Sequence, residues 1–261
     1  MQCYFYSILF TLLIPMSSIG QNTSKNILVD NLGNVYIIQK DKISEFDSDG
    51  KLKANFSYKN SGEISSVDVT DPLKIVVFYK NFGQLIFLDN TLSITNGPMH
   101  LFEKGVINPV LVCASSDKGL WIYDKQNFTI FKYDDNLQLQ LHISDIPLQI
   151  ESDFDPVFMM SINSFLYITD PQEGIFVFDK YGSLYKKLHF KDVFYFDILD
   201  NSIVYREKDD IKKIDLMTYS ELITNVTDKV FISQTFKDNF AYLLNADGTS
   251  FTKIKLAFYK K

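Results

Sequence analysis

The sequence predicts an all-β protein, a six-bladed β-propeller of four-stranded antiparallel blades, and three observations support this prediction. Aromatic residues make up 15% of the 261 residues, and aromatic side chains favour the pleated, half-buried surfaces of strands. Short alternating or apolar runs bounded by turn residues recur along the chain, which is typical of strands. A unit of about 40 residues repeats, and four short strands in each such unit are the signature of a propeller blade.

Composition sets the class of protein. Hydrophobic residues make up 46% of the chain and charged residues 22%, which excludes a disordered, collagen-like or heptad-repeat protein. The formal net charge is -6, so a nucleic acid would have to bind against the overall electrostatic field. We therefore expect no nucleic-acid partner.

The N-terminus predicts export. Residues 1–20 carry no charged side chain, and Tyr4–Ile14 is almost wholly apolar. This run is shorter than the ~20 residues of a membrane span, and Pro15 and small residues follow it, as in a signal peptide. We expect cleavage before Gln21, which leaves residues 21–261 as one propeller domain with no transmembrane span. An anchor that is not cleaved remains the alternative. The mature protein is expected to be a monomer that is periplasmic, associated with the outer membrane, or extracellular.

Cysteine usage follows from this cleavage. Cys3 leaves with the signal peptide and Cys113 remains alone, so an internal disulfide is not expected. Cys113 lies in the apolar run Pro109–Ala114, which indicates a small buried hydrophobic residue rather than a reactive thiol.

The first unit shows the expected blade in full. Its four predicted strands are Ile27–Asp30, Val35–Ile38, Ile43–Asp47 and Leu52–Tyr58. Glycine-containing and asparagine-containing turns join successive strands, which favours antiparallel hairpins. No stretch carries a sustained helical period, so no helix is required. The last unit is degenerate, since it ends after a third strand near Leu256, and either residues 21–26 lend it a fourth strand or it has only three.

An apolar residue followed by aspartate ends a strand in five of the units, at intervals of about 40 residues. The five pairs are Phe46-Asp47, Leu88-Asp89, Tyr133-Asp134, Phe178-Asp179 and Ile214-Asp215. An aspartate that opens a tight turn and accepts a hydrogen bond from the backbone two residues later accounts for all five. Asp47–Gly50 also matches the start of a calcium loop, but the later ligands of that loop are missing. We expect no cofactor, with calcium as the alternative.

The unit resembles the blades of NHL-type propellers. Their pattern is a glycine before an apolar-Tyr-apolar strand, then an apolar-x-x-Phe strand and a second glycine. The chain matches it at Gly33–Ile37, Ile43–Phe46 and Gly50, and again at Phe165–Ile168, Ile175–Phe178 and Gly182. The resemblance implies the fold and hardly constrains function. In having glutamine directly after the expected cleavage site, the chain resembles exported proteins of Bacteroidota.

Two long connections mark the candidate binding site. In a four-stranded blade, the turns between the second and third strands and the connections to the next blade emerge on one face of the disc. The connections 96–108 and 144–155 are longer than the others, and loops of this length need a functional or structural reason. Their candidate binding residues are His100, Phe102, Glu103, Asp145, Glu151, Asp153, Phe154 and Asp155. A charged, solvated edge without a ligand is the alternative interpretation.

Two functions remain open. The three histidines are far apart in the sequence, and no spacing indicates a nucleophile with its base or a shared metal. The first hypothesis is a non-catalytic exported propeller that binds a protein or a glycan in the cell envelope. The second is a propeller-type hydrolase or lyase with carboxylates at the axis, with or without calcium, for which acids from several blades would have to converge.

Overall fold

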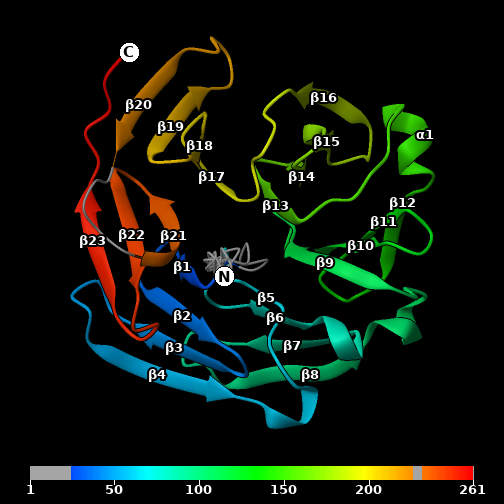
Figure 1. Ribbon diagram of the computed structural model, residues 1–261. Coiled ribbons are helices and arrows are strands. Elements are labelled where there is room, and N and C mark those ends of the chain that lie inside the picture. Colours follow the sequence, from blue (N-terminus) through cyan, green and yellow to red (C-terminus); the bar gives the residue numbers. More distant parts are fainter. Residues whose placement is uncertain (1–24, 226–230, 261) are drawn as a thin grey trace, which may run out of the picture.

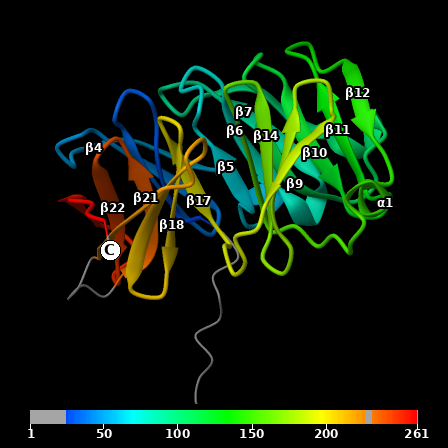
Figure 2. The same cartoon turned by 90° about the horizontal axis from the view of Figure 1, so that it is seen from above.

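The computed structural model describes residues 25–225 and 231–260. Six sheets surround a central axis, and each sheet lies beside the next in the order of the sequence (Figure 1). Seen from above, the strands of neighbouring sheets stand side by side (Figure 2). The predicted six-bladed propeller is confirmed, and the predicted signal peptide lies outside the described residues.

Each of the first five blades is a four-stranded antiparallel sheet whose strands pair in the order of the sequence, from the axis outward. The strands of blade 1 are β1 (Ile27–Val29), β2 (Val35–Gln39), β3 (Lys42–Phe46) and β4 (Leu52–Ser57). Those of blade 2 are β5 (Ser66–Asp68), β6 (Ile75–Tyr79), β7 (Gln84–Leu88) and β8 (Ile94–His100). Those of blade 3 are β9 (Pro109–Ala114), β10 (Leu120–Asp124), β11 (Thr129–Tyr133) and β12 (Leu139–Ile143).

Blades 4 and 5 repeat this order, and blade 6 is shorter. The strands of blade 4 are β13 (Phe158–Ile162), β14 (Phe165–Asp170), β15 (Gly174–Asp179) and β16 (Leu184–Leu188). Those of blade 5 are β17 (Phe196–Leu199), β18 (Ser202–Glu207), β19 (Asp210–Asp215) and β20 (Glu221–Asn225). Blade 6 has three described strands, β21 (Phe231–Lys237), β22 (Phe240–Asn245) and β23 (Phe251–Lys255).

Short helices occur only in connections, among the described residues. They are the 3-10 turns η1 (Lys59–Ser61), η2 (Lys80–Phe82) and η3 (Leu101–Lys104) and the α-helix α1 (Ile146–Ile150). The sequence did not require α1, and its five residues are too few to show a helical period. None of the helices described in 25–225 and 231–260 has the length and apolar character of a membrane span.

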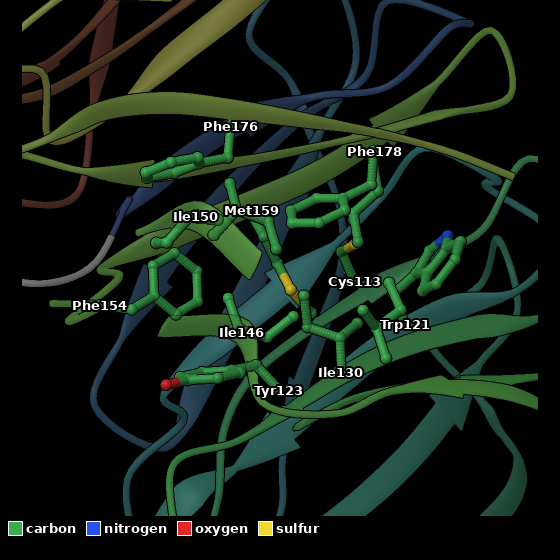
Figure 3. Packing of buried hydrophobic residues seen from close by; sticks show 13 residues of the cluster. Cys113, Trp121, Tyr123, Ile130, Ile146, Ile150, Phe154, Met159, Phe176 and Phe178 are labelled. Atoms are coloured by element: carbon green, nitrogen blue, oxygen red, sulfur yellow. The ribbon is translucent and has the colours of Figure 1, made fainter. Parts of the chain in front are cut away.

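The core is divided into six clusters, one between each pair of neighbouring blades. Between blades 3 and 4 the buried rings of Trp121, Tyr123, Phe176 and Phe178 pack with aliphatic side chains (Figure 3). Aromatic side chains therefore fill the interfaces between radially packed sheets. This burial is the main stabilising term, at roughly 1.5–3 kcal/mol for each large apolar side chain.

The ring closes between blades 6 and 1 through side chains. Tyr242 and Leu244 pack against Ile27, and Phe251 meets Phe46 edge to face with ring centroids 6.0 Å apart. The backbone N–H of Asn26 donates to the hydroxyl of Ser233, which ties the start of the described chain to blade 6. Of the two predicted closures, the described residues show the three-stranded blade.

The five recurring aspartates open tight turns, as predicted. The Asp47 carboxylate accepts the N–H groups of Asp49 at 3.0 Å and Lys51 at 2.8 Å. The other four accept equivalent N–H groups two residues later, and three or four residues later, in their own turns. Each carboxylate thus satisfies backbone donors that the hairpin leaves unpaired.

Candidate functional site

The turns between the second and third strands lie on the same face as the connections between blades, as predicted. Several backbone hydrogen bonds join a connection to such a turn. Four of them are Ile64 N–H to Lys40 O at 2.7 Å, Leu101 N–H to Gly83 O at 2.8 Å, Lys125 N–H to Asn108 O at 3.0 Å and Asp192 N–H to Pro171 O at 2.8 Å. We call this side of the disc the linker face.

The first long connection is anchored in the core between blades 2 and 3, and it exposes an aromatic ring. Leu101 and Val106 are buried between blades 2 and 3, and the Tyr133 hydroxyl donates to Lys104 O at 2.7 Å. The Phe102 side chain is 74% exposed between these anchors. Of the other predicted residues, Glu103 is exposed, and His100 is exposed with a ring nitrogen 2.9 Å from the Gln84 amide nitrogen.

The second long connection is built around α1. Ile146 and Ile150 are buried between blades 3 and 4, while Leu148 on the opposite side of the helix is 79% exposed. Asp145 and Glu151 flank the helix, and both have left-handed φ angles, 53° and 54°. These two acids are exposed at the surface, as the prediction of a rim requires.

At the end of this connection two acids are exposed, whereas the aromatic ring between them is buried. Asp153 and Asp155 are exposed, and Asp155 forms an ion pair with Lys125 at 2.6 Å. Phe154 is buried, with its ring centroid 5.3 Å from that of Tyr123 and 5.6 Å from that of Phe176 (Figure 3). Phe154 therefore anchors the connection in the core and does not belong to the surface on which it was predicted.

One turn of blade 3 brings the two connections together. The buried Asp124 carboxylate accepts the N–H groups of Ile107 at 2.8 Å and Gln126 at 2.9 Å. The N–H of Ile146 donates to Phe128 O at 3.2 Å. The turn at residues 125–128 thus lies between the first connection and α1. Asp170 occupies the equivalent position in blade 4, and its carboxylate accepts the N–H of Asp155, at the end of the second connection, at 2.7 Å.

Asp124 and Asp170 are not among the predicted site residues. Both are buried, with 0% and 3% of the residue exposed. Their position at the end of a second strand, after Tyr123 and Thr169, is the sequence signal that distinguishes them from the aspartates after third strands. These two carboxylates hold the linker face in shape.

The loops of the linker face in blades 2 and 3 and the connections that follow these blades carry exposed apolar side chains. We call this set the apolar rim: Phe82, Phe102, Ile107, Phe128 and Leu148. Only Phe102 was predicted to be a site residue. Phe128 has a φ of 47°, in the left-handed region where a bulky side chain is a genuine outlier. Its ring is nevertheless 41% exposed, so core packing does not account for this conformation.

A cavity of about 850 Å³ follows the axis and is lined by the inner strands of the blades. Leu28, Val67, Leu111 and Met160 line it, together with polar side chains. Lys25 pairs with Asp197 there at 2.5 Å. Cys113 also lines the cavity but is buried, and burial raises the pKa of its thiol, which fits the predicted hydrophobic residue.

Two of the described acids at the axis each connect one blade to the next. Asp68 of blade 2 accepts the N–H of Ala114 of blade 3 at 2.8 Å. Asp197 of blade 5 accepts the N–H of Phe236 of blade 6 at 2.8 Å. Within the part of the chain that the structure describes, no three His, Cys, Asp or Glu side chains are grouped to hold a metal ion.

The comparisons with known proteins show the fold. No protein-family model and no curated protein matches the chain. A solved streptogramin B lyase is similar, with a TM-score of 0.56 and 15% identity over 92% of this chain and 85% of that chain. Virginiamycin B lyase from Staphylococcus aureus gives a TM-score of 0.52 with 14% identity, over 88% of this chain and 80% of that chain.

A bacterial extracellular domain is similar to the same extent. The extracellular domain of the putative one component system BT4673 from B. thetaiotaomicron gives a TM-score of 0.57 with 13% identity. The match covers 93% of this chain and 35% of that chain. At such identities the likeness establishes the propeller architecture, and the function has to be argued from the sites of this chain.

Proposed function

We propose that this protein is an exported binding propeller that captures a protein partner through the apolar rim. The observation that carries the proposal is that four loops joined by hydrogen bonds expose apolar side chains on one face, with Phe102 74% and Leu148 79% exposed. Contiguous exposed apolar residues bordered by polar ones are the usual mark of a protein-binding surface.

The composition of the rim favours a protein over a glycan. Aromatic rings alone would suit the faces of sugar rings, but Ile107 and Leu148 add aliphatic surface that requires an apolar partner. Predicted site residues border the rim and supply polar contacts: His100, Glu103, Asp145, Glu151, Asp153 and Asp155. Phe154 supports this border from the core.

The conformation of Phe128 also supports the proposal. A bulky residue with a left-handed φ costs of order 1–3 kcal/mol, and such strain persists mainly where it serves a function. Glycine or asparagine would fit this turn at lower cost. The strained turn instead presents an aromatic ring next to α1.

Export is part of the proposal. Its support is the uncharged apolar segment 1–20 followed by small residues, together with the fold likeness to an extracellular domain. The full chain expressed in a Gram-negative host should appear outside the cytoplasm with Gln21 as its first residue, by mass spectrometry of the intact protein. Recovery of the chain with Met1 in the cytoplasm would refute export.

The binding test compares two matched double variants. Phe102→Ser with Leu148→Ser removes an aromatic and an aliphatic side chain from the rim. Tyr181→Ser with Leu73→Ser removes the same two kinds from turns of the opposite face, where the side chains are 73% and 69% exposed.

Natural protein and both variants are used as baits against the envelope fraction of the source cell, with quantitative mass spectrometry. A protein retained by the natural protein and by the control variant, but lost with the rim variant, supports the proposal. It is then purified and its affinity measured by calorimetry, where loss of two central apolar contacts should weaken binding at least about tenfold. Equal retention by all three baits would overturn the assignment of the rim.

A further inference from the structure

We propose a second binding site, at the outer edge of blade 6, that takes an extended peptide segment in which acidic and apolar residues alternate. Blades 1 to 5 have a fourth strand, whereas the described part of blade 6 ends at β23 (Phe251–Lys255). Figure 1 shows β23 as the outer strand of its sheet, and the chain after it runs toward β20. Among the described residues, no strand lies on the outer side of β23.

Every other described outer strand has a feature that blocks the addition of a further strand. Pairing of β4, β8, β12 and β16 with the strand inside each of them is interrupted by a β-bulge or irregularity, which is a common protection of sheet edges. The pairing of β19 with β20 is regular, but Tyr259 of the C-terminal segment bridges Ile223 of β20. The register of β22 with β23 is regular, and no described residue pairs with the outer edge of β23.

The backbone of β23 presents unpaired groups to this edge. Asn245 N–H donates to Ser250 O at 2.9 Å, and Leu256 N–H donates to Asn239 O at 2.8 Å. In an antiparallel pair the residues that exchange such bonds alternate, and the register places Thr252 and Ile254 in the same set. The N–H and C=O groups of Phe251, Lys253 and Lys255 therefore point away from β22 and are available to a guest strand.

The side chains along β23 define the chemistry of the guest. Lys253 and Lys255 are exposed on the side toward blade 1, where the Lys253 ammonium lies 4.4 Å from the Phe240 ring centroid. Ile254 packs on the other side with Phe258. Cross-strand neighbours share a face, so acidic guest residues would lie opposite the two lysines and an apolar one beside Ile254.

The positive charge of β23 also disfavours its pairing with the β23 strand of a second copy of the protein. No acidic residue occurs from Ser250 to Lys260, which contains three lysines, although the whole chain has a net charge of -6. Two β23 strands placed edge to edge would bring lysines together, and like charges across strands are destabilising. The same lysines attract an acidic strand, which is the mode of recognition called β-augmentation.

The test uses a labelled eight-residue peptide in which glutamate and valine alternate, with fluorescence anisotropy as the readout. A second peptide has lysine in place of glutamate, and a third carries N-methyl groups on alternate amides. The protein is used in its natural form and as Lys253→Glu with Lys255→Glu. The matched control is Lys40→Glu with Lys42→Glu, which makes the same charge change at two exposed lysines of blade 1.

We expect the natural protein and the control to bind the glutamate peptide, and the β23 variant to bind it at least about tenfold more weakly and to prefer the lysine peptide. Hydrogen exchange should slow at the amides of Phe251, Lys253 and Lys255. Equal binding of the glutamate and lysine peptides, undiminished binding of the N-methylated peptide, or no binding would each overturn the proposal. The rim variant Phe102→Ser with Leu148→Ser should bind the glutamate peptide normally, so the two proposals fail independently.

Discussion

Replacing Asp124 with alanine tests whether a buried carboxylate holds the linker face together. Its oxygens accept the N–H groups of Ile107, Asn108, Gln126 and Asn127 and the Asn127 side-chain amide, at 2.8 to 3.4 Å. Hydrogen bonds to charged groups contribute about 1.5–3 kcal/mol each. Only those from Ile107 and Gln126 are shorter than 3.0 Å, and both donors lie near solvent, so we expect a total loss of about 2–4 kcal/mol.

Urea unfolding measures this loss, and Asp47→Ala is the control. Asp47 accepts two N–H groups in an exposed turn, where water replaces the carboxylate, so its removal should cost only about 0.5–1 kcal/mol. Hydrogen exchange at Ile107 and Asn108 should accelerate in Asp124→Ala and not in Asp47→Ala. If the two variants lose equal stability, or if Asp124→Ala loses less than about 1 kcal/mol, Asp124 does not organise the face.

Three further predictions follow from the structure. Phe251→Ala removes the contacts with Phe46 and Tyr242 that close the ring and should cost about 2–4 kcal/mol in thermal unfolding, whereas Phe102→Ala should change stability by less than about 0.5 kcal/mol. Hydrogen bonds from Ser250 and Thr249 lower the pKa of Asp247 from 3.8 to about 2. A carboxylate whose pKa is lower in the folded than in the unfolded protein stabilises the fold at pH values above its unfolded pKa. This contribution should therefore be lost as the pH falls from about 4 to 2. A melting temperature that rises as the pH falls over that range would contradict the prediction. Added calcium or chelator should leave the melting temperature unchanged, since no acids converge among the described residues. A clear rise with calcium would favour the propeller-type hydrolase or lyase.

The repeat carried most of the fold prediction. Alternating strands and the aspartates that open turns are local signals, so the five pairs from Phe46-Asp47 to Ile214-Asp215 located the blades correctly. The short helix α1 has no such signal, because its conformation is determined by the burial of Ile146 and Ile150 between two blades. The number of strands in blade 6 stayed open, since a missing strand leaves no residue to recognise.

The site was predicted less completely for a physical reason. Loop length indicated the two connections. The sequence does not show, however, whether an apolar side chain in a loop is buried in the core or exposed to solvent. Phe154 fills the core and Leu148 points to solvent, although both lie in one acidic connection. Ile107 lies in the same long connection as Phe102, whereas Phe82 and Phe128 belong to short turns that only the fold brings to the same face.

The carboxylates at the axis have a consequence for the shape of the surface. Asp68 and Asp197 each bind a backbone N–H of the following blade, so they resist sliding of one blade along the axis relative to the next. Close packing of side chains already opposes such sliding, and each hydrogen bond adds a contact of fixed length and direction. The fixed height of blade 2 against blade 3 keeps their loops level with each other, so the surface proposed to bind a partner is preorganised.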